Sequence, residues 1–171
     1  MLTLKLPKDV AADPRHDAVW NLLTTNATSL WEGGNLRVPM LQFNQGLAAE
    51  CRQSISDRLA IPGLEAIGKV LASEQKGLDA LSAKAPNAPQ NPRVSRLLLM
   101  SNGGSKRFYR DCEALLAKYD QRVMGCRLDV TGNHFGSVIF GKPKLVQAVL
   151  FVDKKAVARA LLALVSPEPT V

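Results

Sequence analysis

The chain has little of what catalytic sites and single-strand-binding surfaces usually need. Aromatic residues make up 5% of the 171 positions, and histidine occurs only twice. So few aromatic side chains argue against a protein that stacks single-stranded nucleic acid on aromatic platforms. The three cysteines, Cys51, Cys112 and Cys126, fit neither a disulfide framework nor the spacing of a zinc site. They are typical of core thiols in the reducing cytoplasm, where we expect the protein to be located.

Long apolar runs are also missing. No stretch approaches the 18 consecutive apolar residues of a membrane-spanning helix. The first residues, MLTLKLPKDV, lack the apolar core of a secretory signal peptide. We therefore expect neither a signal peptide nor a membrane partner. Apolar residues nevertheless make up 46% of the chain, which is typical of a globular protein with its own core.

What the chain does have is an uneven distribution of charge. Residues 1–92 contain nine basic and nine acidic residues, whereas residues 93–171 contain thirteen basic and six acidic ones. The second part therefore accounts for the whole formal net charge of +7. A basic excess confined to one part of a globular chain favours a polyanionic partner, above all nucleic acid, or an acidic protein surface.

The first 60 residues are predicted to form a helical N-terminal portion, with one short strand at Leu2–Leu6. Apolar residues on one face predict a helix that ends at the Gly33–Gly34 pair, and apolar residues four positions apart predict another over 40–60. Pro62 is expected to begin a third helix. The proline-rich residues 84–92 are expected to form a loop, because they cannot continue that helix.

After residue 92 short apolar runs alternate with amphipathic segments. Strands are predicted at 96–101, 122–130 and 145–152, and helices at 105–119 and 154–165. Spacing this tight predicts parallel strand–helix–strand units. The fold class is therefore α/β: a small three-layer α/β/α sandwich over residues 61–166, preceded by the helical portion and followed by a tail, 167–171. The segment T-G-N-H-F-G, residues 131–136, is expected to be a loop.

Two segments carry candidate chemistry. The turn S-N-G-G-S-K-R, residues 101–107, joins a strand to a helix, a geometry in which backbone amides hold phosphate. Its spacing is not that of a Walker loop, and a plain capped turn is the alternative. Lys142 and Lys144 precede the third strand; if all strands are parallel, they lie at the opposite end of the sheet. His134 and Asp129 could form an acid–base pair, although no nucleophile motif accompanies them.

Three segments after residue 60 follow one another in an order that a known family also shows. They are I-G-K-V-L-A-S (67–73), L-L-L-M-S-N (97–102) and F-G-S-V-I-F-G-K-P (135–143). This order resembles the kink-turn-binding ribosomal protein family and its small bacterial relatives, over residues 61–166. The chain has Ser73 where the RNA-contacting turn of that family has a glycine. The resemblance implies RNA contacts from a helix, from the turn after a strand and from the loop before the last strand.

We therefore predict a non-enzymatic RNA-binding or ribosome-associated protein that needs no cofactor and no metal. The resemblance implies that Gln75 and Lys76 contact bases, whereas Lys69, Lys106 and Lys144 contact phosphate. The full predicted set, on one continuous basic face, is Lys69, Glu74, Gln75, Lys76, Asn102, Lys106, Arg107, Lys142 and Lys144.

Two alternatives remain open. The first is a small phosphate- or nucleotide-binding enzyme, which needs a pocket where His134 converges with residues 103–106. The second is a protein–protein adaptor that uses the N-terminal helices as its docking surface.

Overall fold

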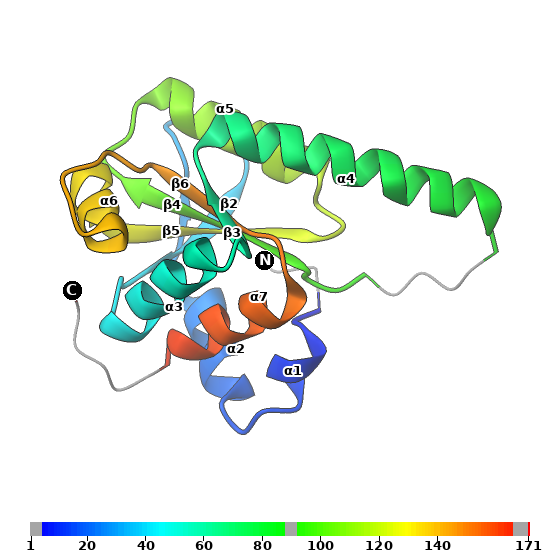
Figure 1. The fold of residues 1–171 in the computed structure, drawn as a ribbon, viewed down its shortest axis with the longest axis horizontal. Helices are drawn as coiled ribbons and strands as arrows, with labels where there is room; N and C mark the ends of the chain where they lie inside the picture. Colours follow the sequence, from blue (N-terminus) through cyan, green and yellow to red (C-terminus); the bar gives the residue numbers. More distant parts are fainter. Residues whose placement is uncertain (1–4, 88–91, 166–170) are drawn as a thin grey trace.

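A mixed six-stranded sheet lies between two layers of helices in the computed structural model (Figure 1). The structure describes residues 5–87, 92–165 and 171. The strands are β1 (Ala27–Ser29), β2 (Arg37–Leu41), β3 (Ala60–Pro62), β4 (Arg96–Asn102), β5 (Val123–Thr131) and β6 (Ala148–Phe151). The helices are α1 (Lys8–Ala11), α2 (His16–Thr25), α3 (Gln45–Ser56), α4 (Leu64–Lys84), α5 (Lys106–Lys118), α6 (Gly132–Phe140) and α7 (Lys154–Ala163). The predicted α/β fold is confirmed.

The central strand β4 shows how the layers are divided. Successive side chains of a strand point to opposite faces of the sheet. Leu97 and Leu99 pack into a core cluster with residues of α1, α2, α3, α6 and α7. Leu98 and Met100 pack into a second cluster, with residues of α4 and α5. Both faces of β4 are therefore buried, as the continuous apolar run R-L-L-L-M-S predicts.

The prediction that residues 7–60 contain helices and no strand is wrong. Helices α2, α3 and α4 form in the predicted regions, but β1, β2 and β3 lie between them. Strand β2 pairs with β5 in parallel, and β3 pairs with β6, so both contribute to the same sheet as the later strands. These strands are short, and Pro39, which has no N–H to donate, made β2 look unlike a strand. Of the predicted first strand, only residues 5 and 6 are described, and Lys5 forms a single bridge with Arg93.

The prediction of a loop at T-G-N-H-F-G is also wrong, because these residues begin α6. Thr131 caps this helix, and its side chain accepts a hydrogen bond from the backbone N–H of His134 at 3.2 Å. The two glycines of the segment, Gly132 and Gly136, suggested a loop from the sequence. In the structure they are helical and buried. Of the predicted loop at 84–92, residues 88–91 lie outside the described part, as does most of the predicted tail.

The strand directions correct one further prediction. Strands β4 and β5 are parallel, as expected, but β6 is antiparallel to β4, with Leu97 opposite Phe151 and Met100 opposite Ala148. The intervening helix α6 stays beside the end of β5 at which it starts (Figure 1). The chain therefore re-enters the sheet from the end at which it left. We call the end where β4 and β5 finish the carboxyl end of the sheet, and the end where they begin the amino end.

Candidate nucleic-acid interface

The turn between β4 and α5, at the carboxyl end, satisfies much of its own backbone. Ser105 caps α5, and its hydroxyl accepts from the Phe108 N–H at 3.1 Å. The Tyr109 hydroxyl donates to the Ser101 carbonyl at 2.6 Å and accepts from the Gly104 N–H at 3.0 Å. The amides of Phe108 and Gly104 therefore already have partners. A ligand at this turn would contact its side chains rather than a set of free backbone amides.

The side chain of Asn102 is held in place by an arginine that the sequence analysis did not single out. Arg127, on β5, donates to the Asn102 Oδ1 at 2.8 Å. The Arg127 guanidinium also lies 4.2 Å from the centre of the Tyr109 ring. Asn102 therefore presents its amide in a fixed orientation. An arginine within a strand of mostly buried residues is the sequence signal that could have revealed this contact.

Two cations on α5 lie against a tryptophan from the loop between β1 and β2. The Lys106 Nζ is 5.3 Å and the Arg110 guanidinium carbon 5.5 Å from the centre of the Trp31 ring. The indole N–H of Trp31 donates to Glu113 at 2.9 Å, which fixes the ring against α5. Arg107, the next residue on the helix, is exposed. Trp31 was not predicted, because the segment that carries it lies far away in the sequence. Arg110 was left out of the predicted set, although it lies on the same helix as Lys106.

The loop before β6 lies at this same end. The Ser101 N–H donates to the Gln147 carbonyl at 2.8 Å, which places the end of the loop beside the end of β4. The loop also packs against α6, since the Val146 N–H donates to the Gly132 carbonyl at 3.0 Å. Lys142 and Lys144 are exposed on it. The antiparallel direction of β6 thus places both lysines at the end of the turn, not at the opposite end.

Glycine at position 136 makes this packing of the loop geometrically feasible. A Cβ atom at Gly136 would overlap the carbonyl oxygen of Lys144. The Lys144 Nζ lies 4.1 Å from the centre of the Phe140 ring, at the end of the same helix. The position of the lysine-bearing loop therefore depends on close contact with α6.

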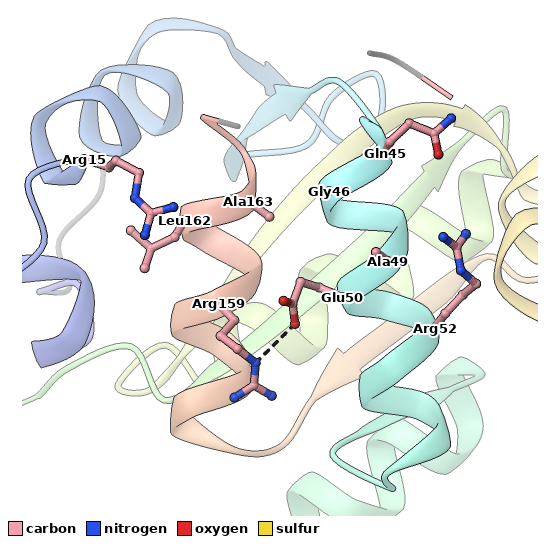
Figure 2. A pocket seen from close by; sticks show the side chains of 9 residues that line it. All are labelled: Arg15, Gln45, Gly46, Ala49, Glu50, Arg52, Arg159, Leu162 and Ala163. Carbon is pink, nitrogen blue, oxygen red and sulfur yellow. Dashed lines mark hydrogen bonds and ion pairs between the residues drawn. The ribbon is translucent and has the colours of Figure 1, made fainter. Parts of the chain in front are cut away.

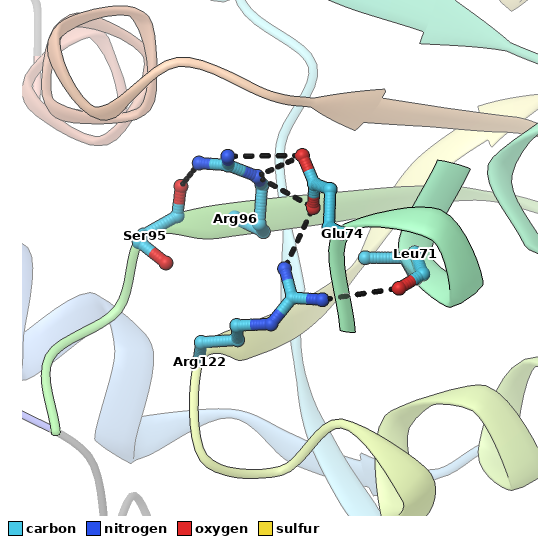
Figure 3. Close-up of polar contacts among 5 residues, drawn as sticks. All are labelled: Leu71, Glu74, Ser95, Arg96 and Arg122. Atoms are coloured by element: carbon cyan, nitrogen blue, oxygen red, sulfur yellow. Dashed lines mark hydrogen bonds and ion pairs between the residues drawn. The ribbon is translucent and has the colours of Figure 1, made fainter. Parts of the chain in front are cut away.

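Glu74, at the amino end, belongs to an ion-pair cluster (Figure 3). Its carboxylate lies 2.9 Å from Arg96 and 2.7 Å from Arg122, the residues at the starts of β4 and β5. Arg122 also donates to the Leu71 carbonyl at 3.2 Å. Partial burial raises the pKa of Glu74, but the hydrogen bonds and charges of Arg96 and Arg122 outweigh it and hold that pKa below its usual value. Glu74 therefore joins α4 to the sheet.

The structure thus divides the predicted set. Asn102, Lys106, Arg107, Lys142 and Lys144 lie together at the carboxyl end. Glu74, Gln75 and Lys76 lie near the amino end, where the Gln75 amide donates to Asp79 at 3.0 Å. Lys69 lies between the two groups on α4, 3.5 Å from Glu65 in an exposed ion pair.

The two residues of the alternative acid–base pair are both exposed. Asp129 lies on β5, and His134 lies in the first turn of α6. Residues Asn102 and Thr131 are aligned in the β4–β5 pair, so the start of α6 neighbours the turn after β4. The enzyme alternative further requires a pocket around His134 and residues 103–106.

A cavity of about 620 Å³ lies elsewhere, along the groove between α3 and α7 (Figure 2). Its lining residues are Arg15, Gln45, Gly46, Ala49, Glu50, Arg52, Arg159, Leu162 and Ala163. Two of its three arginines already have acidic partners: Arg159 lies 3.2 Å from Glu50, and Arg15 lies 2.9 Å from Asp13. The groove therefore offers a ligand much less positive charge than its arginine count suggests.

The cysteines are buried in the core. Burial raises the pKa of Cys112 and of Cys126 to about 12, and it also raises the pKa of Cys51. Within residues 5–87, 92–165 and 171, no three His, Cys, Asp or Glu side chains gather where they could hold a metal ion. Among the same described residues, no helix combines the length and hydropathy that crossing a bilayer requires.

Comparison with models of known protein families and with curated proteins gives no match.

Proposed function

We propose that the protein binds structured RNA, without a chemical step, through a basic edge at the carboxyl end of the sheet. The basic edge consists of Asn102, Lys106, Arg107, Arg110, Lys142 and Lys144. The observation that carries the proposal is the antiparallel direction of β6. It brings the lysine-bearing loop to the same end of the sheet as the start of α5, so that two short basic segments lie at one end.

The cations of the basic edge are available to a ligand. All five are exposed, and none forms an ion pair with an acidic side chain in the part of the chain that the structure describes. Lysine and arginine side chains that contact phosphates release the counterions condensed on a nucleic acid, and this release favours binding. The Asn102 Oδ1 already accepts from Arg127 and from the Gly103 N–H, so its amide supplies a neutral donor among these charges.

The edge suits a structured RNA better than a single strand. Single-strand-binding surfaces stack successive bases on exposed aromatic rings. At the basic edge Trp31 is only partly exposed and lies against Lys106 and Arg110, so it does not offer an open stacking platform. Double-stranded RNA is instead recognised by its shape and through its phosphates and 2′-hydroxyls.

The proposal is tested by measuring the dissociation constant for an RNA hairpin as a function of salt concentration. We expect a linear log–log dependence of affinity on salt. Lys106→Glu with Arg107→Glu removes two phosphate contacts and should weaken binding by about tenfold or more. Lys142→Glu with Lys144→Glu should have a similar effect. Glutamate in the first turn of a helix is favourable, so the α5 variant should remain folded.

A matched control is available at the other end of the sheet. Lys154 and Lys155 begin α7 after its cap Asp153, just as Lys106 and Arg107 begin α5 after Ser105. Changing both lysines to Glu alters the net charge by the same amount, but far from the basic edge. With a screening length of about 8 Å at physiological salt, RNA affinity should stay within about twofold. An equal loss in the control, or binding that is independent of salt, would contradict the proposal.

A further inference from the structure

Helix α4 carries one apolar stripe that its own domain covers only in part. Residues at alternating spacings of three and four lie on one face of a helix. On α4 these residues are Leu64, Ile67, Leu71, Glu74, Leu78 and Leu81. Ile67 and Leu71 are fully buried in the core, whereas Leu78 is 42% and Leu81 64% exposed. We call Leu78 and Leu81, with the helix surface around them, the α4 seam.

The α4 seam lies beyond the sheet. Figure 1 shows the second half of α4 extending past the amino end, where β4 and β5 begin. Every described residue from Lys76 to the end of the helix is exposed. The two leucines therefore add little to the core of this domain, although they lie on the same helix face as Ile67 and Leu71, beyond the ion-paired Glu74. Exposed apolar residues on a part of a helix that extends beyond its own domain are typical of a helix that packs against another molecule.

The side chains next to the α4 seam are mainly basic. One helical turn before Leu78, Glu74 lies between Arg96 and Arg122 and balances only one of their two charges (Figure 3). Lys118 and Arg122 each lie 5.5 Å from the centre of the Tyr119 ring, which places Lys118 in the same cluster.

The extended part of the helix itself is also more basic than acidic. It carries Lys76 and Lys84, both exposed, against a single carboxylate, Asp79, which is hydrogen-bonded to Gln75. Asp120, exposed between Lys118 and Arg122, adds one more carboxylate. The basic side chains around the α4 seam still outnumber the acidic ones, so the two leucines have a net positive surround.

We propose that the α4 seam docks an amphipathic helix of a partner protein, with apolar residues three and four positions apart and acidic residues on both flanks. Such a helix continues the packing of α4 and complements the positive surround. A second copy of this chain would bring the same positive charges together. RNA is not the proposed partner, because it has no aliphatic side chains that could pack against Leu78 and Leu81. This surface is separate from the basic edge, so the inference does not depend on RNA binding.

The probe is a synthetic helical peptide with leucine at the seam positions and glutamate on both flanks, measured by fluorescence anisotropy. The matched probe has the same leucines and lysine on the flanks. We expect the acidic peptide to bind at least tenfold more tightly than the basic one. Leu78→Gln with Leu81→Gln should weaken binding of the acidic peptide by at least tenfold and leave the melting temperature unchanged, because both side chains are exposed.

Ala80→Gln with Ala83→Gln is the control, since it adds two amides to other exposed positions of the same helix segment; it should leave peptide affinity unchanged. The Lys106→Glu, Arg107→Glu variant should bind the peptide normally, which separates this proposal from that of the basic edge. Equal binding of both peptides, no binding of the acidic one, or full binding by the leucine variant would overturn the proposal. So would a dimer in sedimentation equilibrium that the leucine variant dissociates, or RNA binding that requires the two leucines.

Discussion

Arginine and lysine side chains lie at both ends of the sheet, but their exposure and their partners differ. At the amino end the side chains of Arg96 and Arg122 are only 19% and 11% exposed, and both are bound to Glu74. At the carboxyl end the cations of α5 and of the loop before β6 are exposed and have no acidic partner among the described residues. The charges of Arg96 and Arg122 thus stabilise the fold at the amino end, whereas those of the carboxyl end remain available to a ligand. Exposure and pairing decide the role of an arginine or a lysine more than the charge itself does.

The largest effect is expected for Gly136→Ala, at the carboxyl end. The new Cβ would overlap the Lys144 carbonyl, and a backbone atom cannot move aside as a side chain can. We expect the free energy of unfolding to fall by about 3 kcal/mol, the upper end of the range for overpacking. The displaced loop should also weaken RNA binding. Chemical denaturation and the RNA hairpin assay measure the two effects.

Gly77→Ala is the matched control for this change. Gly77 lies on the exposed part of α4, and a Cβ atom there meets no other atom within 4 Å. Alanine is the better helix former, so this variant should gain up to about 1 kcal/mol. If Gly136→Ala were as stable as the wild type, the loop would not depend on its contact with α6.

A somewhat smaller effect is expected for Glu74→Ala, at the amino end. Removing the carboxylate leaves two largely buried guanidinium groups without their acceptor. We expect a loss of about 2 kcal/mol, below the range for fully buried pairs because the cluster is partly exposed. RNA affinity should not change. The control is Glu65→Ala, which removes an exposed ion pair on the same helix and should cost less than about 0.5 kcal/mol.

The pH dependence of stability also tests the ion pairs that Glu74 forms with Arg96 and Arg122. The pKa of Glu74 is lower in the folded protein than in the unfolded chain. Its contribution is therefore fully present above the unfolded pKa, about 4.3, and is lost as the pH falls through the folded pKa. The difference in melting temperature between the wild type and Glu74→Gln should narrow as the pH is lowered below that value. A constant difference would contradict the ionised cluster.

The smallest effect on RNA affinity is expected for Gln75→Ala with Lys76→Ala. These are the residues that the kink-turn resemblance assigns to base contacts, yet they lie near the amino end, away from the basic edge. We expect affinities for a kinked RNA and for a plain duplex both to stay within about twofold of the wild type, since no base contact is lost. A selective loss of binding to the kinked RNA would show that the amino end recognises RNA and would favour the resemblance.

Much of the fold could be predicted from local sequence patterns. The apolar run of β4 and the stripe on α5 are unambiguous because both are long and strongly patterned. Strand β2 was missed because it has only five residues and includes Pro39. Helix α6 was missed because its glycines serve a tertiary contact that the local sequence does not show.

The candidate site was harder to predict than the fold. Its basic segments were found from charge and turn residues, but their arrangement depends on the direction of β6. That direction follows from where α6 packs, and no local pattern in the sequence encodes it. Trp31 and Arg127 were missed for a related reason, since each meets its partners through contacts between distant segments.

The strand order has a consequence for synthesis of the protein on the ribosome. Strand β2 needs β5 as its neighbour, and β3, at the edge of the sheet, needs β6, which ends at Phe151. A nascent chain that has completed α4 therefore exposes the apolar faces of its helices and two strand segments without their later neighbours. Contacts so distant in sequence slow folding and leave such surfaces open to aggregation. We expect the sheet to be completed only after β6, which ends at Phe151, has emerged.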